Sequence, residues 1–114
     1  MHSILHLDKI MNIEILRDYC LALDGAEETF PFGDDTIVFK VNGKIFAMAN
    51  LDGETALNIK CEPAYALELR EMYPSVTPGY HMNKKHWNTV VLDGSVPDRM
   101  IFDWIDHSYK LVRK

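Results

Sequence analysis

No stretch of the sequence is apolar for long enough to cross a membrane, and the chain does not open with a secretion signal. A transmembrane helix needs about 20 consecutive apolar residues, and polar or charged residues break every window of that length here. The first ten residues, MHSILHLDKI, have neither a basic opening segment nor a small-residue cleavage site. We therefore expect a folded, cytoplasmic protein that does not bind a membrane.

Cysteine is also scarce. Cys20 and Cys61 are the two cysteines of the chain, and their spacing matches no CxxC motif. They fall in segments that we expect to be a buried helix and the end of a strand. Such positions favour reduced thiols in the core over a disulfide or a redox pair.

The motifs of catalysis and of metal binding are missing. The six glycines never cluster as GxGxxG or as the GxxxxGK of a phosphate-binding loop, and no serine lies in a GxSxG elbow. His81 and His86 stand five residues apart with Lys84 and Lys85 between them, and adjacent ammonium groups raise the cost of holding a metal cation there. We expect no enzymatic activity, no cofactor and no metal.

The chain has no overall excess of positive charge either. Its formal net charge is -5, whereas nucleic-acid binders need lysine and arginine to displace the counterions of the phosphates. Acidic side chains dominate residues 1–35, and we interpret Asp34 and Asp35 as solvated turn residues; residues 36–92 are slightly basic. A local basic face is still compatible with this distribution, with weak long-range steering toward DNA.

The length of the chain, 114 residues, is typical of a single domain. Apolar spacing predicts a first helix after Asn12, a second over about 63–73, and a third that opens with Ser95 as a capping residue and runs to the end of the chain. Runs rich in β-branched and aromatic residues predict strands. These strands are TIVFKV (36–41), KIFAMAN (44–50), TALNIK (55–60) and WNTVVL (87–92).

Two dipeptides predict how the first three strands are connected. Asn42-Gly43 and Asp52-Gly53 favour primed turns, which join antiparallel neighbours. The element order is then α-β-β-β-α-β-α. That order predicts the α+β class, with an antiparallel sheet that carries its helices on one face.

Four stretches of the chain carry a family resemblance. They are PFGDDTIVFKVNGKIFA (31–47), LNIKCEP (57–63), PGYHMNKKHWNTV (78–90) and IDHSYKLV (105–112). Together they resemble the MmcQ/YjbR family of small bacterial proteins, over residues 11–114. We therefore expect one domain at 11–114 and an N-terminal extension or tag remnant at 1–10.

The resemblance implies a fold and a function. The implied fold is a single α+β domain whose curved antiparallel sheet is packed against helices. The implied function is DNA binding through a wing-like arrangement of strands. The fold is also similar to that of secretion chaperones, which bind proteins.

Lysines near the expected strand ends are the best candidates for a binding site. Lys44 opens the second strand, Lys60 ends the third on the side away from the apolar residues, and Lys84 and Lys85 precede the fourth. If these ends lie together, they form a basic rim that can contact phosphates. The hypothetical nucleic-acid site consists of Lys44, Lys60, Lys84, Lys85, Trp87, His81 and His86.

Plainer interpretations of the same residues stay open. Lysines at strand ends also serve as solvated charges that protect a sheet edge, and Trp87 is favoured as a packed residue over a stacking platform for bases. We interpret HMNKKHW as a structured turn made by Pro78-Gly79. A protein-interaction or chaperone-like module is the alternative to nucleic-acid binding, and a monomer is favoured.

Overall fold

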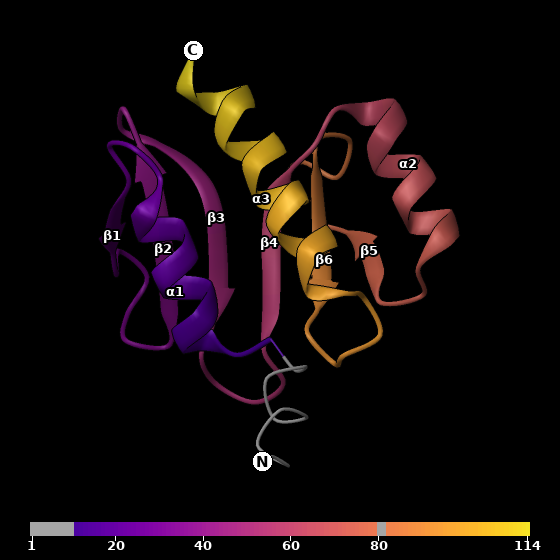
Figure 1. Cartoon of the computed structure of the whole chain (residues 1–114), viewed down its shortest axis with the longest axis horizontal. Coiled ribbons are helices and arrows are strands. Elements are labelled where there is room, and N and C mark those ends of the chain that lie inside the picture. The colour runs from indigo at the N-terminus through magenta and orange to yellow at the C-terminus, as the bar shows by residue number, and fades with distance from the viewer. Residues whose placement is uncertain (1–10, 80–81) are drawn as a thin grey trace.

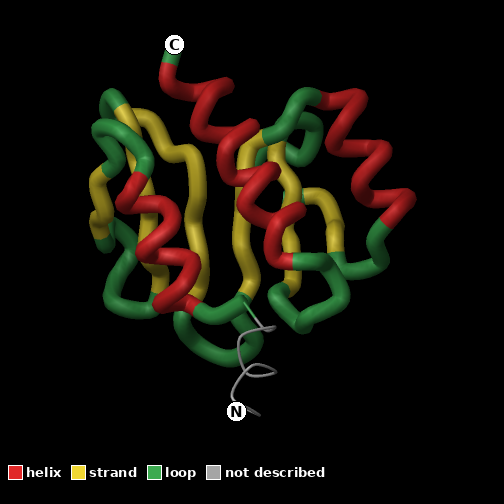
Figure 2. Tube along the Cα trace, in the orientation of Figure 1, coloured by secondary structure: helices red, strands yellow, loops and turns green. Residues whose placement is uncertain are grey.

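The computed structural model describes residues 11–79 and 82–114. Within these residues, three helices pack on one face of a six-stranded antiparallel sheet (Figures 1 and 2). The helices are α1 (Ile13–Ala22), α2 (Pro63–Met72) and α3 (Asp98–Arg113). The strands are β1 (Glu27–Thr29), β2 (Thr36–Val41), β3 (Lys44–Asn50), β4 (Ala56–Lys60), β5 (Val76–Pro78) and β6 (Trp87–Val91).

The sheet has the strand order β1-β2-β3-β4-β6-β5. The predicted α+β class and the order of the helices and the four longer strands are confirmed. Two strands of three residues, β1 and β5, add one edge each to the predicted sheet. Every neighbouring pair of strands is antiparallel. The point where one strand ends therefore lies at the same end of the sheet as the point where its neighbour begins.

The core lies between the sheet and the helices. One side of α3 is buried along its whole length, as the sequence predicted, and Trp104 and Ile105 sit at its centre with 2% and 0% of their surface exposed. Phe39, Phe46 and Leu57 are fully buried members of the same cluster on the strands beneath. This face therefore holds most of the apolar surface that stabilises the fold.

Helix capping matches the prediction at α1 and differs at α3. The side chain of Asn12 accepts a hydrogen bond from the Ile15 amide at 2.9 Å, so Asn12 caps α1. The prediction that Ser95 caps α3 was wrong, because the capping position belongs to Pro97 and the Ser95 hydroxyl instead contacts Asp93 and Ser75. Ser95 fixes the loop before the helix, not the helix itself.

The two predicted turns also differ from each other. Asn42 and Gly43 have φ angles of 53° and 77°, so they form the primed turn expected between β2 and β3. Asp52-Gly53 lies within a longer loop, because β3 ends at Asn50 and β4 begins at Ala56. The Asn50 side chain holds this loop by hydrogen bonds to Asp52, Glu54 and Ala56.

The other face of the sheet carries no helix among the described residues. Side chains that alternate with the core residues point to this face, among them Val38, Met48 and Asn58, which are register partners across β2, β3 and β4. Asn58 accepts a hydrogen bond from the Thr89 hydroxyl on β6 at 2.5 Å. We call this surface the helix-free face.

Some sequence predictions fall outside what the structure describes. Residues 1–10, interpreted as an extension or tag remnant, are not among the described residues. Within the described part of the chain, no helix combines the length and the apolar content that crossing a membrane requires.

Candidate functional site at the basic end of the sheet

Strand direction brings the four predicted lysines to one end of the sheet. Lys44 opens β3 and Lys60 closes β4, while Lys84 and Lys85 belong to the turn that leads into β6. The strands β3, β4 and β6 are consecutive in the sheet, and Lys60 is the register partner of Trp87. Adjacent strands are about 4.8 Å apart, so these positions lie next to one another at one end of the sheet. We call this end the basic end.

The last turn of α3 adds further cations to the basic end. The Asn42 side chain donates a hydrogen bond to the Arg113 carbonyl oxygen at 2.9 Å, which ties the C-terminus of α3 to the β2–β3 turn (Figure 1). Arg113 and Lys114 therefore lie beside the turn that precedes Lys44. Both are exposed.

The opposite end of the sheet has the opposite charge. Three loops gather there, at residues 30–35, 51–55 and 92–97, and none of them contains lysine or arginine. Their acidic residues are Asp34, Asp35, Asp52, Glu54 and Asp93. We call this the acidic end, and the separation along the strand axis is partial, because Glu27 and Glu62 lie near the basic end.

Arg70 on α2 holds the turn that carries Lys84 and Lys85. Its Nε donates to the Asn88 side-chain oxygen at 2.7 Å, and its Nη2 donates to the carbonyl oxygens of Lys84 and of Trp87, the latter at 3.3 Å. Within the turn, the Asn83 side chain accepts from the Lys85 amide at 2.8 Å. The lysine positions are thus set by a guanidinium that bonds backbone as well as side chain.

Trp87 is buried, which is the interpretation that the sequence favoured. It is 9% exposed and lies on the helix-free face, outside the main core cluster. Gly79 passes so close that a Cβ there would meet the Trp87 Cβ at 2.7 Å. Gly79 also donates to the Trp87 carbonyl oxygen at 2.8 Å, so Pro78 and Gly79 continue the strand pairing and do not make the turn that we predicted.

The two histidines of the predicted site have different outcomes. His81 lies outside the described residues. His86 is partly buried, and its backbone closes the junction with β4, because its carbonyl oxygen accepts from the Cys61 amide at 2.7 Å. Among residues 11–79 and 82–114, no group of three or more histidine, cysteine or acidic side chains is arranged to hold a metal ion.

Both cysteines are free and buried. Burial raises the pKa of Cys20 to about 12, with a further contribution from the charge of Asp106. Burial likewise raises the pKa of Cys61 to about 11, assisted by the charge of Glu62. Thiols with such pKa values stay protonated at neutral pH, and the thiolate is the reactive form.

The sequence predicts no role for two residues that hold the site together, Arg70 and Ser108. Arg70 was one charged residue on a helix, and nothing local indicates a partner 14 to 18 residues further along the chain. Ser108 lies within the predicted third helix, and its hydroxyl accepts from the Lys60 amide at 2.9 Å and donates to the Phe46 carbonyl oxygen at 2.6 Å. The signal in the sequence is that Ser108 is a polar residue at helical spacing from the apolar residues Trp104, Ile105 and Val112.

Comparison with known proteins identifies the family of this chain. The family model YjbR matches residues 21–111. The chain belongs to the YjbR family. This YjbR-family protein is 38% identical over 107 residues to Uncharacterized protein YbdF of Escherichia coli O157:H7, covering 93% of this chain and 88% of the relative. It is 39% identical over 101 residues to Uncharacterized protein YjbR of Escherichia coli K12, covering 88% and 86%.

Solved structures of other family-like proteins agree with the fold of this YjbR-family protein. The crystal structure of Deinococcus radiodurans protein DR2400, described with the domain DUF419, superposes with a TM-score of 0.88 at 40% identity and covers 93% of this chain and 81% of that one. A Pseudomonas syringae protein superposes with a TM-score of 0.81 at 29% identity and covers 90% and 100%. Both solved structures therefore share the fold of this chain.

Proposed function

We propose that this YjbR-family protein binds nucleic acid weakly, and largely without sequence preference, through the basic end of its sheet. The observation that supports the proposal is the separation of charge along the strand axis. Lys44, Lys60, Lys84 and Lys85 share one end with Arg113 and Lys114, and the loops at the other end hold carboxylates and no base. A polyanion attracts the first end and repels the second.

The same charges limit the affinity. Each lysine that neutralises a phosphate releases counterions, so a small set of contacts gives modest binding that weakens as salt rises. Non-specific complexes of this kind have dissociation constants of about 1–100 µM at physiological salt. Because contacts between lysine and phosphate carry no information on bases, little sequence preference is expected.

Base stacking contributes little to this proposal. A ring that is 9% exposed offers almost no surface to a base, so Trp87 is assigned to packing and not to contact. Lys84 and Lys85 are exposed on a turn that Arg70 holds through the Lys84 carbonyl oxygen. These two lysines are therefore the positions to change first.

The test is fluorescence anisotropy with a labelled duplex and a labelled single strand at two salt concentrations. Changing Lys84 and Lys85 together to alanine should weaken binding about equally for all sequences and reduce the salt slope by about 2 for duplex DNA. Alanine keeps the backbone bonds to Arg70 and Asn83, so the turn itself is retained.

Arg99 and Lys44 provide a matched pair of controls. Both are exposed and each alanine change removes one positive charge, but Arg99 lies at the start of α3, at the acidic end. Lys44→Ala should lower affinity, whereas Arg99→Ala should leave it nearly unchanged. Equal losses in the two variants would attribute binding to net charge and not to the basic end. If wild-type protein shows no salt-dependent anisotropy change at about 50 mM salt, the proposal fails and a protein-interaction role becomes the one to pursue.

A further inference from the structure

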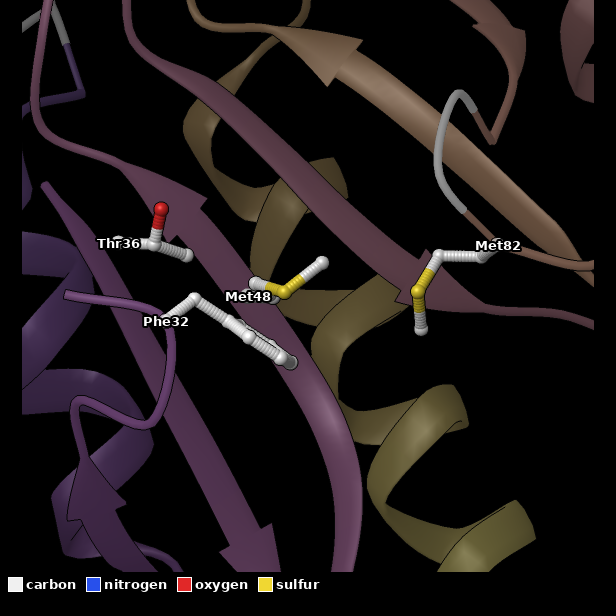
Figure 3. A pocket seen from close by; sticks show the side chains of 4 residues that line it. All are labelled: Phe32, Thr36, Met48 and Met82. Atoms are coloured by element: carbon white, nitrogen blue, oxygen red, sulfur yellow. The ribbon is translucent and has the colours of Figure 1, made fainter.

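The helix-free face of the sheet contains a hollow of about 390 Å³ that the proposed function does not use. Figure 3 shows its four lining side chains, Phe32, Thr36, Met48 and Met82. Met48, on β3, lies between the other side chains, with Phe32 and Thr36 to one side and Met82 across the sheet from them (Figure 3). The volume is within the range of about 300–1,000 Å³ that small-molecule pockets occupy.

The Phe32 wall is held by backbone bonds. Gly33 has a φ of 108°, a conformation that favours glycine, and its amide donates to the Phe30 carbonyl oxygen at 3.3 Å. The Asp35 carbonyl oxygen accepts from the Leu51 amide at 2.6 Å, which ties the loop 30–35 to the loop 51–55. The ring of Phe32 is nevertheless 66% exposed.

The Met82 wall is held in a similar way. The residue after it, Asn83, accepts from the Trp87 amide at 2.9 Å through its carbonyl oxygen. Its side chain fixes the next turn through the Lys85 amide. Hydrogen bonds thus hold the backbone beside both walls, which lowers the cost of ordering the pocket on binding.

The lining favours an aromatic ring as ligand. Two thioethers and one phenyl ring are polarizable and make favourable contacts with aromatic edges and faces. A planar ring placed in the hollow would contact chiefly the exposed ring of Phe32 and would also touch Met48, which is 7% exposed. Thr36 is the one lining residue with a polar side chain, so the pocket would bind weakly a ligand that relies on many hydrogen bonds.

The loop that supplies Phe32, and the loop tied to it, carry carboxylates that favour a cation. Asp34 and Asp35 stand between the lining residues Phe32 and Thr36 in the chain, and the tethered loop 51–55 adds Asp52 and Glu54. All four carboxylate residues are exposed, so their attraction is moderate and sensitive to salt. We propose that this pocket binds a small planar aromatic cation. Because the Met82 wall leads to Lys84 and Lys85, the positive group of the ligand lies on the Phe32 side.

The test uses proflavine, a planar three-ring cation at neutral pH, and full-length protein with methyl-labelled methionine. Saturable binding should shift the NMR signals of the Met48 and Met82 methyl groups. The methyl groups of Met72 on α2 and Met100 on α3 should not move, because both helices lie on the other side of the sheet. The apparent Kd should rise with salt.

Two variants and two controls separate the contributions of the ring and of the charge. Phe32→Ala removes an exposed ring and should weaken proflavine binding about three- to ten-fold. Asp34→Asn with Asp35→Asn should weaken it about two- to ten-fold and reduce the salt dependence. Met72→Ala and Asp103→Asn, which change exposed residues on α2 and α3, should leave the Kd unchanged.

Anthracene carboxylate, a planar three-ring anion, completes the test. It should bind more weakly than proflavine and should gain affinity in the double asparagine variant. Equal or tighter binding of the anion would overturn the assigned charge, and shifts outside Met48 and Met82 would overturn the assigned site. The proposal is independent of nucleic-acid binding, since Lys84→Ala with Lys85→Ala should not weaken proflavine binding.

Discussion

The two faces of the sheet follow different rules of construction. The helix-covered face is apolar and closed, with Phe39, Leu57 and Ile59 exposed by 2% or less. The helix-free face also buries Val38 and Met48, at 0% and 7% exposed, but it mixes them with polar residues such as Asn58, and loops instead of helices cover it in the described chain. The contrast indicates that the helix-covered face holds the main apolar cluster, whereas the helix-free face is more mixed and carries the hollow beside Phe32. Substitutions on the two faces should therefore have separable effects.

The largest effect is expected at Trp104, at the centre of the helix-covered face. It is 2% exposed and packs edge-on against Tyr73, with 5.4 Å between ring centroids. Trp104→Ala should lower the free energy of unfolding by about 3–5 kcal/mol, measured by urea titration. Among the described residues, the indole nitrogen has no hydrogen-bond partner, so Trp104→Phe should cost much less. A loss below about 1 kcal/mol for the alanine variant would contradict the packing of α3.

A smaller loss is expected at Ser108, which joins two strands from the helix side. Ser108→Ala leaves the part-buried Lys60 amide and the buried Phe46 carbonyl group without this partner. The expected cost is about 2–3 kcal/mol, by the same titration. Ser95→Ala serves as the control, because Ser95 is exposed and its loss should cost less than about 1 kcal/mol. Similar costs for the two serines would mean that the bridge at Ser108 contributes little.

The cysteines test the closure of the helix-covered face without a mutation. Because their pKa values are raised to about 12 and about 11, Cys20 and Cys61 should react slowly with a thiol reagent at pH 8. The stability linked to these protonated thiols is present below the ordinary thiol pKa and is lost as pH rises toward the raised values. Rapid labelling of either thiol in native protein would show that this face opens.

The smallest effect is expected at Phe32, beside the pocket of the helix-free face. Its ring is 66% exposed, so Phe32→Ala should change the free energy of unfolding by no more than about 0.5 kcal/mol. Thermal unfolding of this variant alongside Trp104→Ala would measure the contrast between the faces directly. A loss above about 2 kcal/mol at Phe32 would mean that the helix-free face also carries the fold.

Local signals in the sequence were sufficient for the longer elements. Alternating β-branched residues located β2 and β3 with their observed ends, and the Asn12 cap with its apolar spacing located α1. They could not reveal β1 and β5, because three residues are too few for a periodic pattern and both strands exist through pairing with a longer neighbour.

Whether the four lysines lie together at one end of the sheet depends on the strand topology, which no single stretch of the sequence encodes. The spacing of Lys44, Lys60, Lys84 and Lys85 along the chain is compatible with a shared end or with dispersal, and strand direction decides between them. Pocket residues such as Phe32 and Met82 are 50 positions apart in the sequence and face each other because two loops fold over one face. Sequence patterns fix which side a residue faces more readily than which loops meet.

The Ser108 bridge sets an order of events during synthesis. It follows Lys60 by 48 residues and Phe46 by 62, so the polar groups that it joins are translated long before it. The backbone pairing of β3 with β4 covers Ala47–Ala49 and Leu57–Ile59. Before Ser108 is made, its hydroxyl cannot join the next two residues, Phe46 and Lys60. Contacts that span such distances form late. A nascent chain of this protein therefore gains this bridge only after Ser108 has left the ribosome, well after β3 and β4 have been made, and a stop before Ser108 would release a chain without it.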